Sequence, residues 1–111
     1  MAPMPNIAPL NLLSAVVVLD RSLEGWTLLD PPSDDLSKSR VFMYPVTFDR
    51  PFAAPPIVQV GLVGLDASKD SNLRVRLRPV DITAAGFVVR AETWWDTRLW
   101  SIDVSWLAVG T

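Results

Sequence analysis

Residues 92–109 read E-T-W-W-D-T-R-L-W-S-I-D-V-S-W-L-A-V and hold four of the five tryptophans of the chain. From Trp100 onward, apolar and polar residues alternate with a period of two. The apolar face comprises Trp100, Ile102, Val104, Trp106 and Ala108, and the polar face comprises Ser101, Asp103 and Ser105. This alternation predicts one long, half-buried β-strand. Trp100 shares the parity of the core face but sits at the mouth of the strand, so a core position and a position protruding beyond the sandwich are both open for it. Residues 93–98, just before it, have no regular period, so at least one of Trp94 and Trp95 is expected to be exposed. Exposed aromatic side chains beside charges are typical of a sugar site or a partner site.

The rest of the chain contains short apolar runs separated by turns rich in Pro, Asp and Ser. These runs predict strands at residues 14–19, 40–48, 57–65, 73–77 and 87–92. Pro45 indicates that the second of these strands lies at a sheet edge or carries a bulge, and Pro79 is expected to end the pairing of the fourth. Regularly spaced short strands without a helical period predict an all-β sandwich.

The strand predicted at residues 73–77 places Arg74, Arg76 and Arg78 on its outward face. Because like charges on one face repel each other, this face is expected to meet acids such as Glu92 or Asp103, or acceptors on another chain. For Arg74 by itself, a structural ion pair and a contact to a ligand are both open.

Composition excludes several function classes. The net charge is only −2, and the sequence has no run of Lys or Arg that could contact successive phosphates of a nucleic acid. Both features argue against nucleic acid as a partner. The chain of 111 residues has no cysteine and no histidine, so thiolate chemistry, cysteine-based zinc sites and the commonest general base are all missing. The scattered acids provide no pair of carboxylates of the kind that glycosidases hold across a cleft. We therefore expect no enzyme activity and no cofactor.

A metal site is not expected either. The oxygens of Asp66, Asp70 and Asn72 suggest calcium, but the glycine and the distal glutamate of a calcium loop are absent. Turn capping by these short polar side chains explains the stretch more simply.

The length suits a single domain, with an amino-terminal arm before it. Residues 1–20 contain Pro3, Pro5 and Pro9 followed by an apolar run, and they are interpreted as an arm that can serve in assembly. Residues 21–111 are assigned to the sandwich. The apolar run at residues 10–19 is too short to span a bilayer and no Lys or Arg precedes it, so neither a signal peptide nor membrane insertion is expected.

Eight short blocks occur in a fixed order along the chain. They are G-W at 25, S-D-D at 33, V-T-F-D-R-P-F-A-A-P-P-I-V from 46, G-L-D at 64, N-L-R-V at 72, I-T-A-A-G-F at 82, T-W-W-D-T at 93 and V-S-W-L-A at 104. In order and spacing, these blocks closely resemble the H-type lectin domain of snail agglutinins and of the carboxy-terminal part of discoidins. The resemblance covers roughly residues 25–109.

The resemblance implies a six-stranded antiparallel β-sandwich that assembles as a homotrimer. It also implies shallow sites between neighbouring subunits that bind N-acetylgalactosamine or galactose. By the same resemblance, Arg74 donates hydrogen bonds to the sugar and Trp94 lines the pocket. Trp95 stands where the best-known snail member has a histidine, and Trp100 stands where the family has a tyrosine that closes the site.

An aspartate from the loop after S-D-D also binds sugar hydroxyls in this family. That loop is shorter in this chain, and Asp35 or Ser37 stands near the aspartate position. Indoles in place of histidine and tyrosine keep the apolar surface on which a pyranose stacks but remove two polar groups, so the sugar can differ from N-acetylgalactosamine.

Two functions are therefore predicted. The first is a non-catalytic carbohydrate-binding module whose trimer adheres to glycan-coated surfaces. The alternative is a structural or host-attachment module of a phage-like spike or fibre, with or without glycan binding, docked through the amino-terminal arm. Either function places the protein outside the cell, at a cell surface or on a virion.

Overall fold

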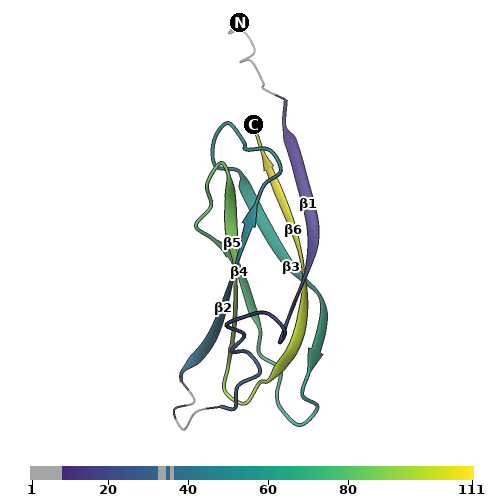
Figure 1. Cartoon of the computed structure of the whole chain (residues 1–111), viewed down its shortest axis with the longest axis vertical. Helices are drawn as coiled ribbons and strands as arrows, with labels where there is room; N and C mark the ends of the chain where they lie inside the picture. Colours follow the sequence, from purple (N-terminus) through teal and green to yellow (C-terminus); the bar gives the residue numbers. More distant parts are fainter. Residues whose placement is uncertain (1–8, 33–34, 36) are drawn as a thin grey trace, which may run out of the picture.

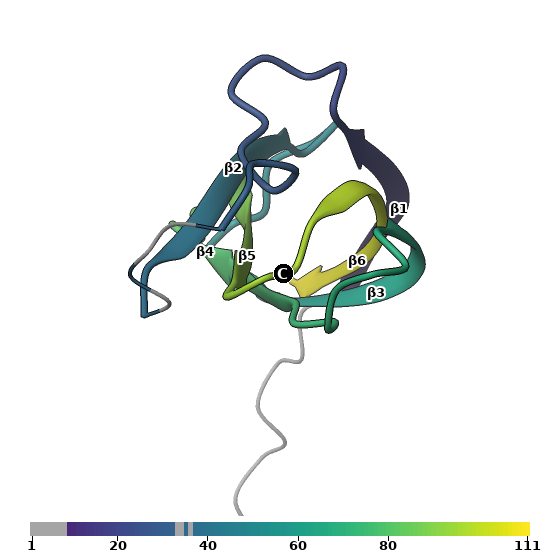
Figure 2. The same ribbon diagram turned by 90° about the horizontal axis from the view of Figure 1, so that it is seen from below.

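The computed structural model describes residues 9–32, 35 and 37–111. These residues form six antiparallel strands in two three-stranded sheets that face each other (Figures 1 and 2). The strands are β1 (Asn11–Asp20), β2 (Ser39–Thr47), β3 (Ile57–Ala67), β4 (Arg76–Val80), β5 (Gly86–Trp94) and β6 (Leu99–Gly110). One sheet has the order β1-β6-β3 and the other the order β2-β5-β4. The predicted six-stranded antiparallel β-sandwich is confirmed.

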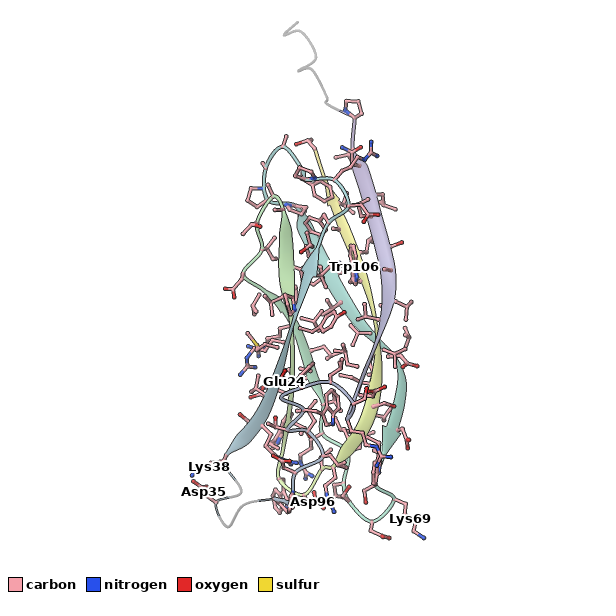
Figure 3. The ribbon with its side chains drawn as sticks, viewed as in Figure 1. Glu24, Asp35, Lys38, Lys69, Asp96 and Trp106 are labelled. Atoms are coloured by element: carbon pink, nitrogen blue, oxygen red, sulfur yellow. The ribbon has the colours of Figure 1, made fainter. Side chains whose placement is uncertain are left out.

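The core lies between the two sheets. Strand β6 is central in its sheet, and its residues Ile102, Val104 and Ala108 are fully buried, as the alternation predicts. Trp106 is 8% exposed and meets the ring of Phe87 from β5 edge to face at 5.5 Å between centroids. Figure 3 shows Trp106 in this interior. Aromatic pairs of this geometry add to the stability that area burial alone provides.

The alternation breaks at the first residue of the predicted apolar face. Ala67 of β3 pairs with Leu99 and Asp66 pairs with Ser101, so Trp100 is an extra residue on β6. A bulge inserts one extra residue into a strand, so the residues before it point to the face opposite to the one that strict alternation would give them. Leu99 is fully buried in place of Trp100, which is 38% exposed. The structure thus decides between the core and the strand mouth for Trp100, in favour of the mouth.

Prolines occupy the edge strands of the second sheet. Pro45 lies in β2, which is an edge strand as predicted. The prediction for Pro79 is wrong: it lies within β4 and is aligned with Val89 of β5. Since β4 is also an edge strand, it needs a hydrogen-bonding partner on one side only, which a proline tolerates. The strand begins at Arg76, three residues later than predicted.

Strand β1 forms the edge of the first sheet. The strand predicted at residues 14–19 is confirmed and extends over Asn11–Asp20, paired with β6 along its whole length. Residues 1–8 of the predicted arm lie outside the described residues, and the division of the chain at residue 20 stays a prediction.

The connections β1–β2, β3–β4 and β5–β6 lie at the end of the sandwich away from the carboxyl terminus (Figure 1). Asp96 in the last of these connections and Lys69 in the second are visible at this end in Figure 3. The described part of the chain contains no helix long and apolar enough to cross a membrane.

Candidate functional site

Two of these connections are joined by a buried hydroxyl. The side chain of Thr97 is fully buried, and its Oγ1 donates to the carbonyl of Asn72 at 2.6 Å and accepts from the backbone N–H of Arg74 at 3.0 Å. Thr93, also fully buried, donates to the carbonyl of Arg74 at 2.5 Å. Side-chain hydroxyls therefore replace strand pairing at residues 72–74, which is why β4 begins only at Arg76.

The clamped backbone presents Arg74 to its neighbours in the β5–β6 connection. Its Nη1 donates to Asp96 Oδ1 at 3.2 Å, and its Cζ lies 4.8 Å from the centroid of the Trp95 ring. Asp96 Oδ2 accepts from the backbone and the side-chain amide of Asn72 at 3.1 and 3.2 Å. We refer to Asn72, Arg74, Trp95 and Asp96 as the Arg74 cluster. It combines a cation, a carboxylate and an indole that is 44% exposed.

Trp95 has a left-handed backbone with φ of 59°. For a bulky residue this conformation costs about 1–3 kcal/mol and persists only where the surroundings enforce it. Arg40 provides part of this restraint: its Nη2 donates to the carbonyl of Trp95 at 2.9 Å, and its Nη1 donates to the carbonyl of Asp30 at 2.6 Å. Burial lowers the pKa of Arg40, and the charge of Asp30 opposes that shift.

Trp94 has different partners from Trp95, as expected for adjacent residues of an extended chain. Arg76 of β4 places its Cζ 4.9 Å from the Trp94 ring and pairs with Glu92 at 3.3 Å. The predicted contact with Glu92 is therefore confirmed, within the described residues, for Arg76 alone, since Arg74 precedes β4 and pairs with Asp96. The other expected acid, Asp103, lies in the opposite sheet beside Gly64, where an added Cβ would come within 2.2 Å of Asp103 Oδ2.

Trp100 lines a separate hollow of about 280 Å³ at the end of the first sheet. Arg21 stacks on its ring at 4.9 Å, and Asp20 accepts hydrogen bonds from the backbone N–H, at 2.8 Å, and from the hydroxyl of Ser22. The hydroxyl and the N–H of Ser22 lower the pKa of Asp20. Asp66 and Ser101 complete this lining, which we call the Trp100 hollow. No hydrogen bond or ring contact among the described residues joins Trp100 to the Arg74 cluster.

Asp35 and Ser37 lie in the connection between β1 and β2. Asp35 Oδ1 accepts from the Ser37 hydroxyl at 2.5 Å and from its backbone N–H at 3.0 Å, and both interactions lower the pKa of Asp35. Figure 3 places Asp35 at the same end of the sandwich as Asp96. Ser33, Asp34 and Leu36, in the same predicted loop, lie outside the described residues.

Sequence reasoning missed three residues of this site. Asp96 lies within the T-W-W-D-T block, and its charge opposite to Arg74 was a usable signal. Asn72 opens the N-L-R-V block, but its short polar side chain is equally typical of a turn. Arg40 gave no signal, because its acceptors are backbone carbonyls, one of them 55 residues away in the sequence. Among the described residues, no group of three or more His, Cys, Asp or Glu could hold a metal ion.

Comparisons with known proteins concern the fold and the family of the chain. The family model of the H-type lectin domain matches residues 44–109. A protein of Fuscovulum blasticum described as "ATP synthase subunits region ORF 7" is 38% identical over 72 residues, which are 65% of this chain and 63% of that relative's length. Native recombinant discoidin II of Dictyostelium discoideum superposes with a TM-score of 0.78 at 24% identity, covering 97% of this chain and 40% of discoidin II. Wild-type discoidin II gives a TM-score of 0.77 at 25% identity, covering 96% and 39%.

Proposed function

The chain belongs to the H-type lectin domain family, and from that premise we propose that it is a non-catalytic carbohydrate-binding module. Its ligands are terminal sugars of the galactose or N-acetylgalactosamine type. The protein works as a homotrimer that adheres to glycan-coated surfaces outside the cell.

The observation that carries this proposal is the Arg74 cluster. The half-exposed indole of Trp95 offers a flat apolar surface on which a pyranose ring can stack through its C–H groups. A carboxylate has about four acceptor positions, and three of those on Asp96 are used by Asn72 and Arg74, so one remains for a sugar hydroxyl. The guanidinium of Arg74 can donate to a second hydroxyl. Hydrogen bonds of this kind, with one charged partner, are stronger than neutral ones.

The trimer is supported by the outer surface of the β1-β6-β3 sheet. The edge strands of this surface carry large hydrophobic side chains that are at least 60% exposed: Leu12, Val16, Val18 and Ile57. We call this surface the apolar face, although the central strand β6 contributes the polar residues Ser105 and Asp103, aligned with Val16 and Val18. Exposed apolar patches of this kind mark protein interaction sites. The Trp100 hollow lies at the rim of the same sheet, since Asp20, Ser101 and Asp66 are aligned across its three strands.

A shallow monosaccharide site of this type is worth about 4–6 kcal/mol, which corresponds to dissociation constants from about 1 mM to tens of micromolar. Linking three such sites on one assembly can raise the overall avidity by roughly 10²- to 10⁴-fold. Adhesion therefore depends on the oligomer more than on any single site.

The test combines a light-scattering mass with calorimetric titration of galactose and N-acetylgalactosamine. We expect Arg74→Ala and Trp95→Ala to lose at least about tenfold in affinity, which is about 1.4 kcal/mol. The matched control is Arg50→Ala, which removes an exposed arginine from the β2–β3 connection and should bind like the parent. If Arg74→Ala and Trp95→Ala bind as tightly as the parent and the control do, the sugar site lies elsewhere.

The alternative, an attachment module of a phage-like particle, is favoured by one observation. Leu10, just before β1, and Leu12, near its start where it pairs with β6, are 67% and 65% exposed. The start of β1 lies at the end of the sandwich away from Asp96 (Figures 1 and 3). A particle held through this end would present the Arg74 cluster outward. A Leu10→Glu variant, changed outside the apolar face, should then keep its sugar affinity but lose attachment to the particle, whereas an independent lectin would lose neither.

A further inference from the structure

A second charged surface lies on the outer side of the β2-β5-β4 sheet. Arg76 and Arg78 of β4 are aligned with Glu92 and Arg90 of β5, and Trp94 continues the row along β5. These five residues are named the arginine face. The side chains of Arg76 and Arg90 are 48% and 28% exposed, and Arg78 is exposed, so the guanidinium groups are open to solvent.

The charges of the arginine face are not balanced. Glu92 pairs with Arg76 and with Arg90, each at 3.3 Å, so one carboxylate serves two guanidinium groups. Within the described residues no ion pair involves Arg78, which lies directly opposite Arg90. Like charges directly opposite on neighbouring strands are destabilising. The arginine face thus carries a net charge of +2 although the whole chain has −2, so the repulsion is local and would be relieved by an anion.

Burial raises the pKa of Glu92, but hydrogen bonds from Arg90 and Ser39 and the nearby arginine charges outweigh it and leave the pKa lowered. Glu92 is therefore ionised at neutral pH. The excess of positive charge on the arginine face remains although this carboxylate contributes its full negative charge. The excess is a fixed property of the arginine face near pH 7.

We propose that the arginine face binds the acidic groups, sulfate or carboxylate, of a negatively charged glycan. The proposal rests on the proposed function, since the sugar chain would run from the saccharide site past Trp94 onto β4 and β5. Aligned residues on neighbouring strands have Cβ atoms about 4.5–5.5 Å apart, and residues two apart in a strand are separated by roughly 6.7 Å. Guanidinium groups at these spacings can share one oxyanion or hold two neighbouring ones, and their planar geometry suits both sulfate and carboxylate.

A glycan fits the arginine face better than other polyanions. The arginine face offers three guanidinium groups, fewer than the roughly 6–10 phosphate contacts that give a DNA-binding protein its strong salt dependence. Trp94 adds an apolar surface beside Arg76, at 4.9 Å, which suits a sugar ring. The arginine face also lies on the sheet opposite the apolar face, so a trimer built through the apolar face would leave it exposed.

The experiment titrates a galactose-terminated oligosaccharide and its sulfated form into the parent, Arg78→Gln and Arg50→Gln. At low salt the parent should bind the sulfated form about fivefold more tightly, and added salt should reduce this preference. Arg78→Gln should lose most of the preference while keeping its affinity for the neutral form, and Arg50→Gln should behave as the parent does. The melting temperature of Arg78→Gln should not fall, because the substitution removes a repulsion.

The outcomes separate this proposal from the proposed function. Equal affinity of the parent for the two oligosaccharides overturns the role of the arginine face and leaves the lectin function intact. Binding of the sulfated form alone, lost in Arg78→Gln, supports the arginine face and overturns the neutral sugar site. If single-stranded DNA or phosphatidylserine vesicles bind as tightly as the sulfated glycan, a glycan is not the ligand class that this surface selects.

Discussion

Replacement of Thr97 by valine tests whether one buried hydroxyl holds the candidate site together. Valine has nearly the same shape, but it can neither accept from the backbone N–H of Arg74 nor donate to the carbonyl of Asn72, contacts of 3.0 and 2.6 Å. Each lost hydrogen bond costs about 1 kcal/mol, and each peptide group left buried without a partner costs about 1–3 kcal/mol. Because the side chain of Arg74 is 28% exposed, water can reach part of this region. We therefore expect the free energy of unfolding to fall by about 2–4 kcal/mol.

Thr97→Ser is the matched control, since it keeps the hydroxyl and removes only a methyl group. Its expected cost is about 1 kcal/mol. Both variants are unfolded in urea at one fixed protein concentration, with tryptophan fluorescence as the signal, because oligomer formation contributes to apparent stability. The slope of the unfolding free energy with urea should stay unchanged. A second readout is sugar affinity, which should fall in Thr97→Val because residues 72–74 are no longer clamped, and should be retained in Thr97→Ser.

A Thr97→Val protein as stable as Thr97→Ser would refute this reasoning, because the two hydrogen bonds would then contribute nothing. A protein that is destabilised as expected but binds sugar with unchanged affinity would show that the clamp supports the fold without positioning Arg74.

Three further predictions follow from other contacts. Arg40→Lys keeps the charge but loses the planar fork that reaches the Trp95 carbonyl, so thermal or urea unfolding should report a loss of about 2 kcal/mol; no loss would mean that Trp95 is restrained by other groups. Val16→Glu introduces a charge on the apolar face and should reduce the light-scattering mass to that of one chain, whereas an unchanged mass would exclude this surface as the subunit contact. Glu92 has a lowered pKa in the folded chain, so its contribution is present above its ordinary value of 4.5 and is lost as the pH falls through the folded pKa. Glu92→Gln should therefore lose less stability than the parent between about pH 7 and about pH 3, and identical losses would contradict the ion pairs of Glu92.

Much of the fold could be predicted from local patterns. The alternation along residues 102–108 depends only on the side-chain period of a strand, which is the same wherever the strand lies. The edge position of Pro45 follows from a missing N–H. The start of β4 could not be predicted in this way. Residues 73–75 look like a strand, but the backbone N–H and carbonyl of Arg74 bond to the hydroxyls of Thr97 and Thr93, which come from other parts of the chain.

The candidate site was predicted in part. The residue types of Arg74, Trp94 and Trp95 suggested a ligand site, and the order of the short blocks suggested its class. The sequence did not indicate which of these side chains contact one another. The contact between Arg40 and the Trp95 carbonyl, and the pairing of Arg74 with Asp96, join segments that are 55 and 22 residues apart in the sequence.

The sequence by itself determined the two-sheet architecture and the family, because period, turn residues and block order are all properties of short segments. Only the tertiary structure decided where the aromatic side chains point. Trp100 leaves the core because a bulge in the β3–β6 pairing adds one residue to β6. Trp95 adopts its left-handed backbone within reach of Arg40 and Arg74, which come from other elements. Register and long-range hydrogen bonds depend on how distant strands align, and this alignment is fixed by packing of the whole sandwich.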